Sequence, residues 1–154
     1  MVTRPQPARS NVWLWGFVIV APGVAWAAHA GLGFRLQHEG LTGWLWALAL
    51  APLIEEIAMR PLLQRGLHER LKVFSPVTGA VSPRWRLDPT AAYLANGLTA
   101  LVFAALHMPV QGWAALWWLV PALALGQTWR LHGQLWRCVG LHAWFNLCLA
   151  MVSR

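Results

Sequence analysis

Long runs without a charged residue constrain this chain more than any other feature. Residues 12–34 and residues 90–129 contain no Asp, Glu, Lys or Arg. A helix of about 20 apolar residues crosses the roughly 30 Å hydrocarbon core of a bilayer, so the first run is long enough for one span and the second for two. With 58% hydrophobic residues and 11% charged ones, the composition is that of a membrane protein and not of a soluble domain.

Two further segments complete the predicted membrane helices, at about residues 41–63 and 136–152. The 40-residue run divides into two spans at a break within residues 107–112, which contain a proline and a glycine. The sequence therefore predicts an all-α, polytopic membrane bundle of about five transmembrane helices. We expect a single membrane-embedded domain over residues 1–154, with a core at about 41–152 that carries the polar motifs described below.

The first run, residues 12–34, has two interpretations. As a membrane helix it would pack through small residues that recur every fourth position. As a cleaved signal peptide, residues 1–30 would end at Ala28-His29-Ala30, which resembles a cleavage site, and two arginines precede the apolar run. The small residues are Gly23, Ala27 and Gly31.

Basic residues are unevenly distributed between the segments that link these helices. Nine Lys and Arg residues fall in the N-terminal tail, in residues 64–88 and in residues 130–137, against two on the opposite side. The positive-inside rule then places the N-terminus in the cytoplasm. The net charge of +7 is a topology signal, and because its basic residues do not follow one face, no nucleic acid is expected as a partner.

Charged residues inside the second predicted span mark the candidate site. Glu55 and Glu56 follow an uncharged stretch, and such groups in a bilayer cost about 2.5–3.5 kcal/mol each on insertion scales, so they normally face a bundle interior and serve a function. Glu56 and Arg60 have the spacing and order of a helical ion pair, which leaves Glu55 without that partner. Pro61 removes a backbone hydrogen bond and predicts that the helix kinks or ends there, with residues 64–88 forming a polar, irregular loop.

Two later spans each carry a pair of residues four positions apart. His107 follows Phe103, and Asn146 follows His142. Each pair projects from one face of its helix, so we expect packed helices to bring both histidines and Asn146 to Glu55. A carboxylate, two imidazoles and an amide form a set that is able to perform acid–base chemistry.

The depths of these residues conflict if every helix begins at the membrane surface. At about 1.5 Å per residue, Glu55 lies roughly 12 Å from the cytoplasmic end of its span, whereas His107 lies about 27 Å from Pro89. We therefore expect the third helix to begin in the cytoplasm and to enter the lipid near residues 96–98.

Taken together, the three motifs resemble those of the CAAX prenyl protease and bacteriocin-processing family of glutamic intramembrane proteases. The resemblance covers about residues 45–150 and keeps the order of the family's motifs. The chain is similar in length to small bacterial members that process C-terminal sorting tags, which implies a bacterial inner membrane. The motifs are Glu55-Glu56-x-x-x-Arg60, Phe103-x-x-x-His107 and His142-x-x-x-Asn146.

The resemblance implies an intramembrane endopeptidase that cuts near the C-terminal or membrane-proximal segment of a membrane-associated protein or peptide. Glu55 and His107 would activate a water molecule, and His142 and Asn146 would donate hydrogen bonds to the developing oxyanion. No cofactor is implied, and the partners are the lipid bilayer and a lipidated or sorting-tagged membrane substrate. The supporting residues would be Glu56, Arg60 and Phe103.

Two other functions remain open at this point. Glu55, His107 and His142 match the ligand set of a catalytic zinc site, which gives a zinc-dependent intramembrane protease, although the chain has no His-Glu-x-x-His helix. A non-enzymatic self-immunity or scaffold membrane protein with an intact motif set is the second alternative.

Overall fold

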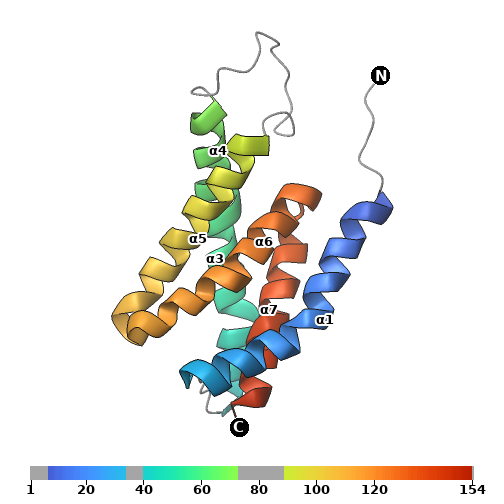
Figure 1. Ribbon diagram of the computed structural model, residues 1–154. Coiled ribbons are helices and arrows are strands. Elements are labelled where there is room, and N and C mark those ends of the chain that lie inside the picture. Colours follow the sequence, from blue (N-terminus) through green and yellow to red (C-terminus); the bar gives the residue numbers. More distant parts are fainter. Residues whose placement is uncertain (1–6, 34–39, 73–88, 154) are drawn as a thin grey trace.

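The computed structural model describes residues 7–33, 40–72 and 89–153, and every element in these ranges is a helix (Figure 1). Three of the elements are not α-helices, since η1 and η2 are π-helical and η3 is a 3-10 helix. In chain order the elements are α1 (Pro7–Leu32), α2 (Gly40–Leu45), η1 (Trp46–Leu50), α3 (Ala51–Ile57), η2 (Ala58–Gln64), α4 (Arg65–Lys72), α5 (Pro89–Gln111), η3 (Gly112–Trp118), α6 (Leu119–His132) and α7 (Leu135–Val152).

Four helical stretches in the described residues are long and apolar enough to cross a membrane. The third reverses direction at Gly112, whose φ of 58° is a left-handed conformation that glycine adopts without steric cost (Figure 1). Its two limbs are the two spans predicted within residues 90–129. The prediction of an all-α, polytopic membrane bundle is therefore confirmed. The four stretches are Asn11–Leu32, Gly40–Lys72, Pro89–His132 and Leu135–Val152.

The helix ends sort into two groups along the bundle (Figure 1). The start of α1, the end of α4, the start of α5 and the turn between α6 and α7 lie toward one end of the bundle, and the end of α7 lies toward the other. Basic residues of the described linking segments gather toward the first end, as the charge count leads us to expect. They are Arg65, Arg70, Lys72, Arg130 and Arg137.

The second helical stretch, Gly40–Lys72, continues through Pro61, so of the two predicted outcomes, a kink or an end, the end is excluded. Pro61 lies inside η2, where the N–H of Arg65 donates to the carbonyl of Arg60, five residues back. A π-helical segment accommodates the missing N–H of a proline without ending the helix. Residues 65–72 of the predicted irregular loop are therefore the helix α4, and residues 73–88 lie outside the described part of the chain.

This extension of the second helix resolves the conflict in depth between the motifs. α4 packs against α5, and the chain continues past Glu55 to Lys72 about as far as α5 runs from Pro89 to His107. Both helices thus extend a similar distance beyond the site toward the same end of the bundle. Glu55 and His107 consequently lie within electrostatic range of each other.

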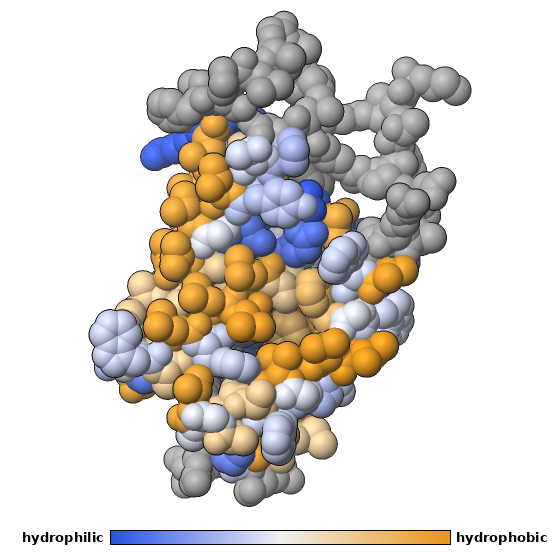
Figure 2. Space-filling view, viewed as in Figure 1, coloured by the Kyte–Doolittle hydropathy of each residue, from blue (hydrophilic) through white to orange (hydrophobic). Residues whose placement is uncertain are grey.

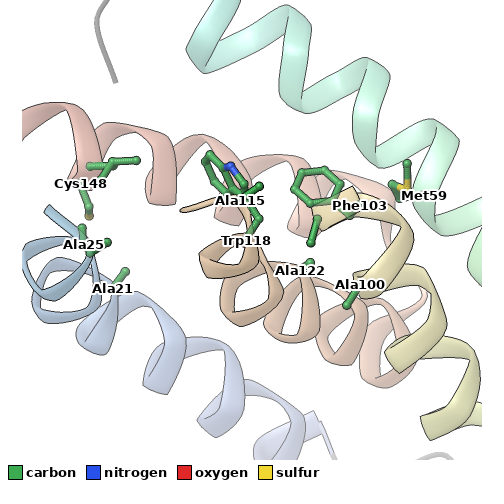
Figure 3. Packing of buried hydrophobic residues seen from close by; sticks show 12 residues of the cluster. Ala21, Ala25, Met59, Ala100, Phe103, Ala115, Trp118, Ala122 and Cys148 are labelled. Carbon is green, nitrogen blue, oxygen red and sulfur yellow. The ribbon is translucent and has the colours of Figure 1, made fainter. Parts of the chain in front are cut away.

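α1 packs on the other helices through small residues, although not through those predicted. Ala21 and Ala25 are buried and share the hydrophobic core with Cys148 of α7 (Figure 3). The carbonyl of Val18 accepts a 3.0 Å hydrogen bond from Nε1 of Trp144, which orients α1 on α7. The predicted packing residues are instead on the exposed face of α1, namely Gly23, Ala27 and Gly31.

The Trp144 bond has a local cause in the sequence of α1. The α-helical partner of the Val18 carbonyl would be the N–H of residue 22, which is Pro22 and has none. In a bilayer no water replaces that donor, so the indole N–H of Trp144 satisfies the carbonyl.

We expect Trp144→Phe to lower the free energy of unfolding by about 1–3 kcal/mol, because it leaves the Val18 carbonyl without a donor. Pro22→Ala restores a backbone N–H at the position that the carbonyl faces. The effect of Trp144→Phe should therefore shrink in a Pro22→Ala background, a coupling that thermal unfolding of the four proteins in detergent measures as a double-mutant cycle. Equal losses in both backgrounds would contradict this account of the bond.

Candidate active site

A buried arginine lies at the centre of the site. The side chains of Arg60 and Glu56 are both 0% exposed, and Nε of Arg60 donates to Oε2 of Glu56 at 2.7 Å. Arg60 also donates from Nη1 to Oε1 of Gln64 at 2.9 Å and from Nη2 to the carbonyl of Ala122 at 3.4 Å. Each guanidinium nitrogen thus has an acceptor, which a buried arginine requires. The ion pair predicted from the helical spacing is present.

Close approach of α6 completes this network. Gln64 donates from Nε2 to the carbonyl of Gly126 at 3.1 Å, and Asn96 of α5 donates to another carbonyl of α6. A Cβ atom on Gly126 would lie 1.7 Å from Oδ1 of Asn96 and 3.0 Å from Nη1 of Arg60. A Cβ at that position would therefore displace the Asn96 side chain. None of these residues was predicted as part of the site. Gln64 could have been, because it follows Arg60 at the same four-residue spacing that separates Arg60 from Glu56.

His142 connects the two adjacent glutamates. Its Nδ1 donates to Oε1 of Glu56 at 2.9 Å, and its Nε2 lies 3.6 Å from Oε2 of Glu55. An ionised carboxylate only accepts hydrogen bonds, so Glu56 holds a proton on Nδ1 of the ring. The Glu55 side chain is 32% exposed, whereas those of Glu56 and His142 are buried. Of the three, Glu55 is the one that an incoming substrate can reach.

Aromatic rings join His107 to this network. His107 donates from Nδ1 to the carbonyl of Phe103 at 2.8 Å, and the two rings are 4.5 Å apart. The Phe103 ring also meets the His142 ring edge-on at 6.0 Å. The Trp118 ring lies 6.1 Å from the Phe103 ring, between ring centres (Figure 3). It also packs on the His107 ring at 5.3 Å. Because a carbonyl only accepts, neutral His107 carries its proton on Nδ1 and keeps Nε2 as an acceptor.

Asn146 lies one turn beyond His142 on α7, and its side-chain amide forms a hydrogen bond with the second helix. Nδ2 donates to the carbonyl of Ala47 at 2.8 Å. In the π-helical η1 the N–H of Ala51 donates to Trp46, and the following residue, Pro52, has no N–H to give the Ala47 carbonyl. Asn146 supplies that donor. Its Oδ1 is buried and has no hydrogen-bond partner among the described residues.

The structure thus brings most of the predicted site residues together. A direct chain of contacts links Arg60, Glu56, His142 and Glu55, and His107 joins it through the Phe103 ring. Asn146 contacts the second helix at Ala47 instead. Trp118, which packs on two site residues, was not predicted, because twelve tryptophans in the chain give no signal that distinguishes one of them.

The zinc alternative named Glu55, His107 and His142 as ligands. Within residues 7–33, 40–72 and 89–153, no three His, Cys, Asp or Glu side chains form a group that could hold a metal ion. In addition, Nδ1 of each histidine is engaged by the protein, by the Phe103 carbonyl and by Glu56 respectively, so each ring offers Nε2 alone. The zinc alternative therefore stays a prediction, which chelation of the purified protein tests.

We expect Gly126→Ala to prevent the close approach of α6 and so to reduce the yield and melting temperature of the protein. The added methyl group would overlap Asn96, and overpacking of this kind costs about 1–3 kcal/mol or more. Gly97→Ala is the matched control, since a Cβ there meets nothing within 4 Å and alanine favours the helix. A Gly126→Ala protein as stable as the control would show that the buried network tolerates a wider helix spacing.

Comparison with known proteins agrees with this arrangement. The model of one family, described as type II CAAX prenyl endopeptidase Rce1-like, matches residues 37–148, which is well over half of the chain and includes all three motifs. No curated protein and no solved structure matches the chain. The chain belongs to the Rce1-like family of type II CAAX prenyl endopeptidases.

Proposed function

We propose that the protein is a glutamic intramembrane endopeptidase in which Glu55 activates a water molecule for attack on a peptide carbonyl. The observation that carries this proposal is the different use of the two adjacent carboxylates. One carboxylate oxygen of Glu56 accepts a hydrogen bond from Arg60, and the other accepts one from His142. Glu55 is partly exposed, and its Oε2 lies 3.6 Å from Nε2 of His142. It also lies within electrostatic range of His107. It is therefore the carboxylate of the pair that is able to take a proton from water.

His107 suits the role of holding that water. With its proton on Nδ1, its Nε2 accepts a hydrogen bond from the water that Glu55 deprotonates. The water oxygen then attacks the carbonyl carbon, and the proton on Glu55 is available to the leaving amine. Phe103 and Trp118 hold the His107 ring in place for this step.

His142 and Asn146 are the proposed donors to the oxyanion. Glu56 holds Nδ1 of His142, so the ring presents Nε2 to the site, and a proton on Nε2 is what the proposed donation requires. Asn146 uses one amide hydrogen on the Ala47 carbonyl and has a second for the oxyanion. One donor of this kind lowers the barrier by about 2.7–4 kcal/mol.

The proposed substrate is a lipidated or sorting-tagged membrane protein or peptide that reaches the site from the bilayer. Support comes from the family, which is one of type II CAAX prenyl endopeptidases, and from the largely hydrophobic face of the bundle (Figure 2). We place the N-terminus in the cytoplasm, because the basic residues gather toward one end of the bundle. The bacterial inner membrane is the location that the motif resemblance implies.

The test of the proposal is Glu55→Gln, which keeps the shape of the side chain but removes the proton acceptor. We expect cleavage of a prenylated C-terminal peptide or a sorting-tagged membrane peptide to fall by about 10²–10⁴-fold, with an unchanged melting temperature. Glu69→Gln, at an exposed position of α4, is the matched control. A Glu55→Gln protein that retains wild-type cleavage would refute the role of Glu55. A folded wild-type protein that cleaves neither peptide would favour the scaffold or self-immunity function.

Chelation distinguishes this mechanism from a zinc protease. We expect the purified protein to keep its cleavage rate after exhaustive treatment with EDTA and phenanthroline, because Glu55 needs no metal to deprotonate water. A zinc protease treated in parallel confirms that the chelators work. Activity that disappears on chelation and returns with stoichiometric zinc would overturn the glutamic mechanism while keeping the same residues at the site.

A further inference from the structure

A polar cavity of about 590 Å³ lies between α4, α5 and α6, at the end of the bundle where basic residues gather. The described residues of its lining include three permanent cations, Arg65, Lys72 and Arg130, against one carboxylate, Glu69. Lys72 pairs with Glu69 at 3.2 Å, so the two arginines leave the cavity with a net positive charge. A cavity of this charge favours an anionic ligand.

Arg130 is oriented before any ligand arrives. Its guanidinium carbon lies 4.5 Å from the centre of the Tyr93 ring, Nη2 donates to the Tyr93 hydroxyl at 3.1 Å and Nε donates to Oε1 of Gln127 at 2.9 Å. A guanidinium that is fixed in this way loses little side-chain entropy on binding. Nη1 is the nitrogen through which it would reach a phosphate.

The residues that hold Arg130 also border an apolar groove. Tyr93 and Gln127 line a second cavity of about 410 Å³ between α1, α5, η3, α6 and α7, with walls that include Val20 and Val24. Arg130 therefore marks a boundary, with the cationic cavity on one side and the apolar groove on the other. Figure 2 shows hydrophilic side chains gathered toward the upper end of this face, above a hydrophobic region. A molecule with an anionic head and an apolar chain matches both parts.

We propose that the cationic cavity binds the phosphate of an anionic phospholipid, whose acyl chain lies in the apolar groove. Basic pockets between membrane helices on the cytoplasmic side are sites for phospholipid headgroups, and the charge count assigns this end of the bundle to that side. The cationic cavity is separate from the peptidase residues, since neither Glu55 nor His142 lines it, and Gln64 links the two because it lines the cavity and accepts from Arg60. The apolar groove comes closer to the peptidase residues, because Trp118, which packs on His107, lines it.

The first experiment measures the melting temperature of the purified full chain in a neutral detergent. At about a hundred times its dissociation constant, added phosphatidylglycerol should raise the melting temperature by roughly 5–10 °C. Phosphatidylcholine at the same concentration should give no comparable shift. Equal shifts with the two lipids would overturn the proposal. A full shift with glycerol phosphate or inorganic phosphate would overturn the lipid as ligand, because the acyl chain would contribute nothing.

Variants then locate the effect in the cavity. Arg130→Gln should remove most of the shift caused by phosphatidylglycerol, and Lys72→Gln, a second lining position, covers the case in which the first variant does not fold. Arg70→Gln removes the same charge from an exposed position of α4 outside the lining and should keep the full shift. A loss as large in Arg70→Gln would reduce the effect to general surface charge and refute the site.

A competition experiment separates the lipid from a peptide ligand. A peptide with a free C-terminal carboxylate should leave bound, fluorescently labelled phosphatidylglycerol in place, whereas unlabelled phosphatidylglycerol should displace it. Displacement of the labelled lipid from the wild type by this peptide, but not by the same peptide with an amidated C-terminus, would assign the cavity to a substrate carboxylate and overturn the lipid proposal.

Discussion

The buried ion pair of Glu56 and Arg60 dictates how the helices of the site pack. Removing one partner of such a pair costs about 3–5 kcal/mol, because the remaining charge is left uncompensated. Every polar atom of the pair therefore needs a partner, and a single helix cannot supply them all. Arg60 uses the carbonyl of Ala122 on α6, and Glu56 uses His142 on α7. The contacts that keep the charges satisfied also position His142 beside Glu55, so the stability of the bundle and the geometry of the candidate site have one origin.

Prolines set a second constraint, because each one in a membrane helix leaves a carbonyl without its usual donor. Two such carbonyls, on Val18 of α1 and Ala47 of the second helix, accept hydrogen bonds from side chains of α7, namely Trp144 and Asn146. α7 thus holds both neighbouring helices through backbone atoms that proline left unpaired. Asn146 consequently has a structural contact besides its proposed part in catalysis, and a loss of activity on its removal has two possible sources.

Features that repeat along one helix were predictable from the sequence, whereas features that join helices were not. The uncharged runs predicted the membrane-spanning helices, and the four-residue spacing predicted the ion pair of Glu56 and Arg60. The prediction of which face of α1 packs against the other helices was wrong. Lipid and protein interior are equally apolar, so hydropathy does not distinguish the two faces. Pro61 predicted a kink or a helix end because proline breaks the α-helical hydrogen-bond pattern, and the π-helical continuation that the structure has instead of an end depends on tertiary packing. Gly126 was missed because its neighbours, Arg60 and Asn96, come from two other helices.

The contacts of Arg60 have a consequence for biosynthesis. Its acceptor on α6, and that of Gln64, lie 62 residues further along the chain. A ribosome makes the chain from its N-terminus, so the second helix is synthesised before α6. Until α6 is made, the guanidinium has Glu56 and Gln64 of its own helix as partners but not the Ala122 carbonyl. A chain that stops before α6 would therefore keep an incompletely satisfied arginine inside its second helix, where an unpaired charge is costly.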